Sequence, residues 1–302
     1  LQQGEIVSFP TETVYGLGAI ATSQEAVLKV FEAKGRPSDN PLILHISKID
    51  ELSAIVKNVP ATAYPLMEAF WPGPMTLIFD KSEAVPYETT GGLDTVAVRM
   101  PEHEGARQLI AAAGLPIAAP SANVSGRPSP TMAEHVKEDL DGRIDMIIDG
   151  GTVGIGVEST IIDLTEQVPV ILRPGHITKH MIEAVIGEVM MDPGLSAKDA
   201  SIRPKAPGMK YRHYAPKADM TVFDGDTKLV IERINQLAKK YKEEEVGILA
   251  TDETQHCYPY GQVVSVGSRN KKTIEQGLFA ALRTFDHKGV EVILSESFSQ
   301  EE

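Results

Sequence analysis

The chain has 302 residues, of which 42% are hydrophobic and 24% charged, and its formal net charge is −13. Its length is enough for two domains, and its composition is typical of a soluble globular protein. It has no apolar run of the roughly 18 residues that a membrane-spanning helix needs. Cys257 is the only cysteine, which excludes an intramolecular disulfide and fits a reducing, cytoplasmic compartment.

The acidic charge is unevenly distributed along the chain. Residues 1–190 hold 13 Lys and Arg against 25 Asp and Glu, a net −12, whereas residues 191–302 hold 16 against 17, a net −1. Residues 195–217 alone hold six basic residues and one acid. Broad binding to nucleic-acid phosphates needs an extended basic face, so this distribution favours a small anion held by a few local cations.

Strands and helices are predicted to alternate through residues 1–192. Strands are expected at residues 6–9, 42–46, 75–79, 95–100, 116–120, 144–149, 159–163 and 170–173. Helices are expected after the N-cap Ser23, around residues 52–56 behind a Ser47–Asp50 cap, at residues 61–70 and 104–113, after the cap Thr131, and at residues 178–186. Residues 10–18 are interpreted as a turn followed by glycines. This order predicts an α/β domain with a mixed, largely covered sheet.

The rest of the chain divides into two further parts. Residues 193–217 hold four prolines, two glycines and the basic cluster, which is the composition of a linker or lid. Residues 218–302 predict a small Rossmann-like α/β domain, with strands at 220–223, 246–250, 263–266 and 290–294 and helices at 229–241 and 273–285. No Gly-x-Gly-x-x-Gly motif occurs there, so no dinucleotide is assigned to it.

Lys34 and Arg36 flank Gly35 at the end of the first predicted helix. A glycine lets backbone approach a ligand closely, and a point charge beside a planar guanidinium suits a polyphosphate. The alternative is a solvated helix end whose cations complement the helix dipole. A Lys-x-Arg pair alone does not distinguish between them.

Three other side chains could likewise either bind a ligand or have a structural role. Thr13 follows a strand end, and its hydroxyl could bind a ligand or satisfy the turn backbone. His45 lies in an apolar strand, where most histidines are structural. The charge of Arg99 must be compensated, either by a buried acid or by a substrate carboxylate.

The loop at residues 120–131 is richer in ligand-binding groups. Small hydroxyl and amide side chains with a glycine, between a strand and a helix, make a plausible nucleotide cradle or an ordinary capped loop. The chain has no Walker motif, no Gly-x-Ser-x-Gly elbow and no His-Glu-x-x-His. Nothing therefore indicates a side-chain nucleophile, and the residue types suit a nucleotide with a small polar substrate.

Together the motifs resemble those of the YrdC-like threonylcarbamoyl-AMP synthases. The resemblance rests on FPTETVYGLG at residues 9–18, KGRP at 34–37, NPL at 40–42 with His45, PSANVSG at 120–126, ESTI at 158–161 and RPG at 173–175. It spans about residues 1–190, and PGMKYRHYAP at 207–216 resembles the longer, two-domain branch. The resemblance implies a YrdC-like twisted mixed sheet with flanking helices, plus the smaller C-terminal domain. The family's second domain continues through a further helix, so residues 218–302 are expected to be incomplete.

The resemblance also implies a nucleotidyltransferase reaction. L-Threonine, bicarbonate and ATP would give threonylcarbamoyl-AMP and pyrophosphate, for tRNA threonylcarbamoyladenosine made with downstream partner proteins. A carbamate formed from threonine is then the nucleophile, and a Mg²⁺ ion would bridge the ATP phosphates with few protein ligands. Direct tRNA binding is left open. The alternatives are an RNA-binding or ribosome-associated module, and a carbamoyl-transferring relative with a different acceptor.

The resemblance implies roles for individual residues, none of them as metal ligands. Lys34 and Arg36 would be catalytic, and Tyr214 with His213 would cover the ligand from the linker. Threonine would be held by Thr13, His45, Arg99, Ala119 and Ser159. ATP would be held by Arg36, Asn40, Thr95, Ser121, Asn123, Ser129, Arg173, His213 and Tyr214.

Overall fold

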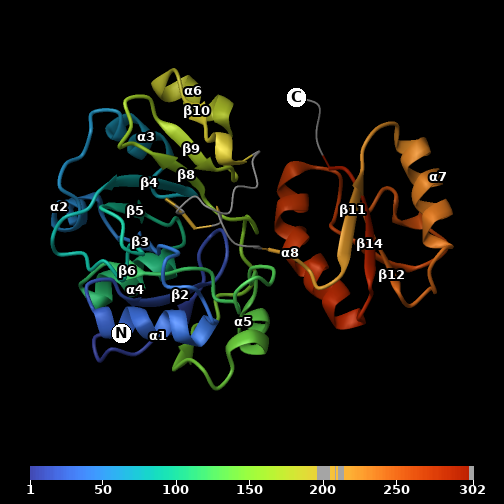
Figure 1. Ribbon diagram of the computed structural model, residues 1–302, viewed down its shortest axis with the longest axis horizontal. Helices are drawn as coiled ribbons and strands as arrows, with labels where there is room; N and C mark the ends of the chain where they lie inside the picture. The colour runs from blue at the N-terminus through green and yellow to red at the C-terminus, as the bar shows by residue number, and fades with distance from the viewer. Residues whose placement is uncertain (196–204, 208, 210–213, 299–302) are drawn as a thin grey trace. The chain divides into compact units, whose positions relative to one another are not determined.

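The computed structural model describes residues 1–195, 205–207, 209 and 214–298 (Figure 1). The chain divides into two compact units. The first comprises Leu1–Ser125 and Ser129–Arg212, and the second comprises Gly126–Pro128 and His213–Glu302. The predicted linker, residues 193–217, falls across this division, and four of its six basic residues lie outside the described part. None of the described helices is long and apolar enough to cross a membrane.

The first unit is built on a ten-stranded mixed sheet, as the sequence predicts (Figure 1). Its strands are β1 (Val7–Phe9), β2 (Gly16–Ile20), β3 (Ile43–His45), β4 (Met75–Asp80), β5 (Thr95–Arg99), β6 (Ile117–Ala118), β7 (Met146–Ile147), β8 (Thr160–Asp163), β9 (Val170–Arg173) and β10 (Met190–Met191). They lie in the order β10-β9-β8-β4-β5-β3-β6-β2-β1-β7. β3 and β5 run parallel at its centre, with His45 opposite Arg99.

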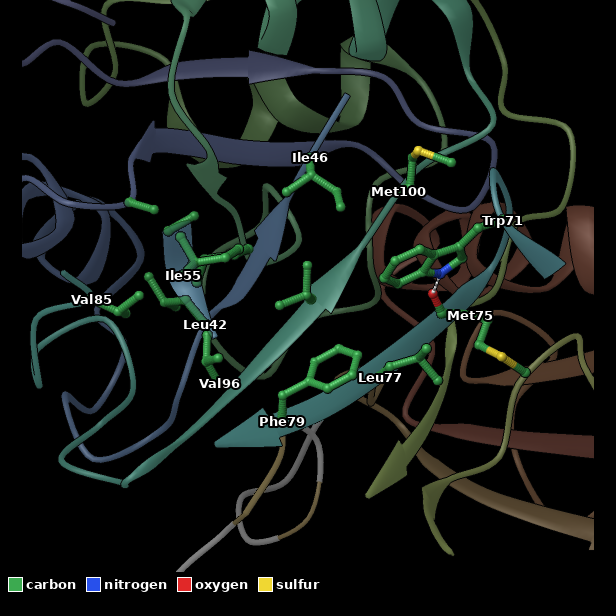
Figure 2. Close-up of a cluster of buried hydrophobic side chains, with 14 of the residues drawn as sticks. Leu42, Ile46, Ile55, Trp71, Met75, Leu77, Phe79, Val85, Val96 and Met100 are labelled. Atoms are coloured by element: carbon green, nitrogen blue, oxygen red, sulfur yellow. Dashed lines mark hydrogen bonds between the residues drawn. The ribbon is translucent and has the colours of Figure 1, made fainter. Parts of the chain in front are cut away.

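Helices of the first unit pack on the sheet. They are α1 (Gln24–Lys34), α2 (Leu52–Ile55), α3 (Ala63–Phe70), α4 (Glu104–Ala113), α5 (Ala133–Leu140) and α6 (Lys179–Ile186), with short 3-10 turns at Ile49–Glu51 and Pro193–Leu195. The main core joins apolar residues of α1, α2, α3, α5 and α6 to alternate residues of the central strands. Figure 2 shows part of it, with Phe79 of β4 beside Val96 of β5, and with Trp71, whose indole N–H donates to the Met75 carbonyl at 2.7 Å.

Two smaller clusters are formed by strand side chains that point away from the main core, to the other face of the sheet. One joins Phe9, Ile20 and Ile117 to α4. The other joins Ile43, Ala97 and Ile161 to Ala206 and Met209. Side chains alternate across a strand, so Ala97 shares its face with Thr95 and Arg99. The described part of the predicted linker therefore covers the sheet face that carries several predicted site residues.

Most predicted elements of this unit are confirmed within a few residues, but β2 was not predicted. Glycines at 16 and 18 mimic a turn, yet both lie in a fully buried strand. A Cβ on Gly18 would lie 2.7 Å from Ile117 Cγ2 and 2.8 Å from Phe9 Cε1. Gly18 is therefore required by close packing rather than by turning.

Two predicted helix caps are wrong. Ser47 bonds to the carboxylate of Glu51 rather than to Asp50, because a 3-10 turn at 49–51 precedes α2. Thr131 does not cap α5, whose N-cap residue is Met132. The Thr131 amide instead donates to His135 Nδ1 at 3.2 Å. In both places a side chain one turn further along supplies the acceptor.

The second unit is a four-stranded parallel sheet with helices, as predicted for a Rossmann-like domain (Figure 1). Its elements are β11 (Asp219–Phe223), α7 (Thr227–Ala238), β12 (Val246–Ala250), β13 (Gln262–Ser265), α8 (Lys271–Lys288) and β14 (Val292–Glu296), with a 3-10 turn at Gln255–Cys257. The strand order is β11-β14-β12-β13. It has its own core, centred on Ile234, Val246 and Ile248.

Candidate active site

A buried ion pair lies where β5 meets the turn after β1. Arg99 is 4% exposed, and its guanidinium lies 2.5 Å from a carboxylate oxygen of Glu12. The other Glu12 oxygen accepts the Glu102 amide at 3.1 Å. Of the two alternatives for Arg99, the structure thus shows pairing with a buried acid. Removing one partner of such a pair would leave the other charge uncompensated.

The same guanidinium orders Thr13, which is fully buried. Arg99 donates to the Thr13 hydroxyl at 2.9 Å, and that hydroxyl also pairs with Thr11 Oγ1 at 2.9 Å. Thr11 in turn donates to the Val14 carbonyl at 2.6 Å. The turn after β1 is therefore held by its own hydroxyls, and it presents Thr13 beside Arg99. Thr13 and Arg99, two of the predicted threonine-binding residues, are thus in direct contact.

His45 ends β3 opposite Arg99 and is 4% exposed. Burial, with the nearby Arg99 charge, lowers its pKa to about 3. Its Nδ1 lies 3.1 Å from the Ile43 carbonyl, and its ring meets Phe9 edge-on with the ring centroids 6.1 Å apart. The imidazole is therefore neutral at physiological pH.

Ser159, another predicted threonine-binding residue, is hydrogen-bonded to Arg173. Its hydroxyl lies 2.7 Å from Thr76 Oγ1 and accepts from Arg173 at 3.1 Å. The same Arg173 nitrogen, Nη2, also donates to the Ser159 carbonyl at 3.0 Å, and Arg173 Nε donates to that carbonyl at 3.1 Å. Arg173 also donates to the Pro207 carbonyl at 3.4 Å, at the described part of the predicted linker.

Glu158 precedes Ser159 and accepts a hydrogen bond from the hydroxyl of Ser129, which is fully buried. Desolvation raises the pKa of this carboxyl, although the Arg173 charge, the Ser129 hydrogen bond and the Arg99 charge act in the opposite direction. Sequence reasoning assigned Glu158 no role. The signal available was an acid at the start of an otherwise apolar and hydroxyl-bearing strand.

Lys34 is 1% exposed at the end of α1, so it is not a solvated helix end. Its ammonium donates to the backbone carbonyls of Ser121 and Asn123, and its own carbonyl accepts from the Ser125 amide at 2.9 Å. Gly35 follows with φ 60°, a conformation that suits glycine. Lys34 therefore anchors the loop that bears two predicted ATP-binding residues.

Arg36 and Asn40 lie in the loop that leads into β3. Arg36 donates to the carbonyls of Asn40 at 3.3 Å and Pro41 at 3.0 Å. Asn40 is 1% exposed, and its side-chain oxygen has no hydrogen-bond partner among the described residues. A buried amide oxygen of this kind is a candidate acceptor for a ligand.

The remaining predicted residues are less closely connected. Ala119 contributes backbone, its amide donating to the Ile43 carbonyl at 2.9 Å. Thr95 begins β5 and Arg99 ends it, so the two lie about 13 Å apart along the strand. Tyr214 belongs to the second unit, where it stacks on Phe279, and His213 lies outside the described residues. Their roles stay predictions.

No group of three or more His, Cys, Asp or Glu side chains that could hold a metal ion occurs among the described residues. The side chains of this region are mostly cationic or hydroxyl groups. That set suits phosphate and carboxylate oxygens better than a bare cation.

Comparisons with known proteins cover both units. A family model described as telomere recombination matches residues 1–175. A model of the C-terminal domain of threonylcarbamoyl-AMP synthase matches residues 177–302. The chain is 52% identical to threonylcarbamoyl-AMP synthase of Bacillus subtilis, over 99% of this chain and 86% of the relative. It is 39% identical to that of Schizosaccharomyces pombe, over 98% of this chain and 81% of the relative.

The fold agrees with solved structures. A crystal structure of Pyrococcus abyssi Sua5 complexed with L-threonine superposes with a TM-score of 0.94 at 51% identity, over 100% of this chain and 87% of that one. Escherichia coli YciO matches 58% of this chain and 85% of its own, with a TM-score of 0.53 at 28% identity. The resemblance in the motifs is thus confirmed over the full length, and the chain belongs to the threonylcarbamoyl-AMP synthase family.

Proposed function

We propose that this protein is a nucleotidyltransferase that makes threonylcarbamoyl-AMP and pyrophosphate from L-threonine, bicarbonate and ATP. The observation that carries the proposal is the burial of the four cationic side chains that the motifs place at the site of the first unit. Lys34, Arg36, Arg99 and Arg173 are each 9% exposed or less. Glu12 pairs with Arg99, whereas Lys34 and Arg36 donate to backbone carbonyls, which carry no full charge. A buried cation is costly without compensation, so this set favours a site for a strongly anionic ligand.

The chemistry needs no side-chain nucleophile. The amine of threonine attacks the carbon of bicarbonate, and loss of water leaves a carbamate. A carbamate oxygen then attacks the α-phosphorus of ATP, and the bond to the pyrophosphate oxygen breaks. Both reactants are anions that repel each other, so the protein contributes by positioning them and by stabilising charge on the leaving pyrophosphate.

The proposed roles are those that the family resemblance implies, and the geometry of the first unit is compatible with them. Arg99 and Thr13, with neutral His45, would hold threonine at the carboxyl ends of β3 and β5. Arg36, Asn40 and Thr95 would hold the nucleotide toward the other ends of these strands, as an extended triphosphate requires. The structure of Pyrococcus abyssi Sua5 complexed with L-threonine supports threonine as a substrate.

We further propose that Mg²⁺ comes with ATP and is held chiefly by phosphate oxygens, where it would neutralise charge. The product would pass to enzymes that modify tRNA, in the cytoplasm. Tyr214 and the linker would cover the labile carbamate and the mixed anhydride, since both react with water. The packing of Ala206 and Met209 on the sheet face of Ala97 supports a cover of this kind.

Pyrophosphate release from ATP tests the proposal. We expect release to require both L-threonine and bicarbonate, and to need no RNA. Release with other amino acids in place of threonine would instead indicate a different carbamoyl acceptor. Absence of release, together with tight RNA binding that weakens steeply with salt, would contradict the proposal and favour a binding module.

A further inference from the structure

Two neighbouring residues, Glu158 and Ser159, contact groups from both proposed substrate sites. The Glu158 carboxylate accepts from the hydroxyl of Ser129, a proposed ATP-binding residue. Ser159, a proposed threonine-binding residue, accepts three hydrogen bonds from Arg173, another proposed ATP-binding residue. A displacement of Ser129 or Arg173 therefore acts on the same dipeptide.

The mechanism proposed above gives the Glu158 carboxylate no role. The residue is half-buried, and its carboxylate accepts from Ser129, in the loop before α5. The charges of Arg173, on β9, and Arg99, on β5, lower its pKa against the effect of burial. The proposed polyanionic substrate would be repelled by this carboxylate. The other acid nearby, Glu12, is already committed to Arg99 and the Glu102 amide. Glu158 is thus a half-buried acid that the proposed mechanism leaves unused.

We propose that Glu158 is a positioning residue that couples the binding of ATP to the binding of threonine. When nucleotide fixes Ser129 and Arg173, the hydrogen bonds to Glu158 and Ser159 fix the start of β8, and with it the Ser159 hydroxyl. Threonine then binds to an already ordered Ser159. Because coupling between two sites is reciprocal, bound threonine raises the affinity for ATP by the same factor. This inference rests on the proposed function.

The test is the dissociation constant of L-threonine, measured by calorimetry with and without saturating α,β-methylene-ATP. In the wild-type protein, the analogue should tighten threonine binding about fivefold or more. Glu158→Ala removes the acceptor of the Ser129 hydroxyl and should lower the factor by about twofold or more, leaving only the part that the Arg173–Ser159 hydrogen bonds carry. Glu158→Gln keeps an acceptor oxygen and should retain most of it. Glu183→Gln on α6 removes an exposed carboxylate of the same unit and serves as the control.

The hydroxyl donor provides an independent check if Glu158→Ala does not fold. Ser129→Ala should reduce the coupling as well, both in the wild type and in the Glu158→Gln background, because each keeps the acceptor that this hydroxyl needs. A purely structural role would lower stability but leave the coupling factor of the folded fraction unchanged.

The outcomes distinguish the two proposals. A wild-type protein that binds neither ligand contradicts the proposed function. One that binds both without coupling, or a Glu158→Ala variant with the full wild-type factor, overturns only the role of Glu158.

Discussion

The imidazole of His45 is held neutral by its surroundings, and this has a consequence for stability. Its pKa is lowered to about 3 from 6.5, chiefly by burial. As pH falls through 6.5 the unfolded chain takes up a proton that the folded protein does not, so stability is lost progressively down to about pH 3. The loss from this group is about 1.4 kcal/mol per pH unit within that window.

This prediction is checked on the unfolding free energy of the first unit at pH 7.5 and pH 5. His45→Asn should show a weaker loss on acidification than the wild type, because only the wild type has this imidazole to protonate on unfolding. In the folded wild type, the His45 ring signals in NMR should not titrate between pH 5 and 8. A ring that titrates near 6.5 would contradict the neutral, buried assignment.

For Arg99, the sequence predicted the need for a compensating charge but not the residue that supplies it. An arginine between apolar strand residues must have its charge compensated, and that requirement was readable from the sequence. Its partner was not, because Glu12 is 87 positions away and only the pairing of strands brings them together. A requirement set by one side chain, such as compensation of its charge, could therefore be predicted. An ion pair between residues that only the tertiary fold brings together could not.

At the scale of elements, Lys34 ties α1 to the loop at residues 121–125. Lys34→Met keeps the buried stem but removes the ammonium, leaving the carbonyls of Ser121 and Asn123 without this donor. We expect a destabilisation of about 1–3 kcal/mol and loss of adenylate formation. Hydrogen exchange of amides 121–125 should become faster, since the loop loses its anchor.

Lys29→Met is the matched control for this change. Lys29 lies on the same helix and donates to the Gly4 carbonyl at 2.8 Å, away from the loop. The Lys29→Met variant should therefore keep turnover, and the hydrogen exchange of amides 121–125, near the wild-type level. Wild-type exchange and turnover in Lys34→Met would mean that the amine neither anchors the loop nor acts on substrate.

Elements with a clear period and clear ends were predictable. The helix at 104–113 is observed with the predicted bounds, because Gly114 ends it in the left-handed conformation. Strands 170–173 and 246–250 are likewise observed as predicted, because they are short apolar runs between turn residues. β2 was missed because Gly18 is required by the closeness of Phe9 and Ile117, which no local sequence pattern indicates.

At the scale of the whole molecule, the two units have separate cores, and the predicted ATP-binding residues belong to both. Most are in the first unit, but Tyr214 is in the second. Ligand that contacts a unit stabilises it by mass action, by about 2.7 kcal/mol at a hundredfold excess over the dissociation constant. For a unit of some 200 residues this corresponds to about 5–10 °C in the melting temperature.

Differential scanning calorimetry with saturating L-threonine and α,β-methylene-ATP should therefore raise both unfolding transitions in the wild-type protein. Tyr214→Ala should abolish the ligand-dependent shift of the second unit and retain that of the first, because only the former depends on Tyr214 reaching the nucleotide. Tyr241→Ala, which removes an exposed tyrosine of the second unit, should keep both shifts. A second transition that ligand never moves would show that Tyr214 does not bind the nucleotide, and would confine the site to the first unit.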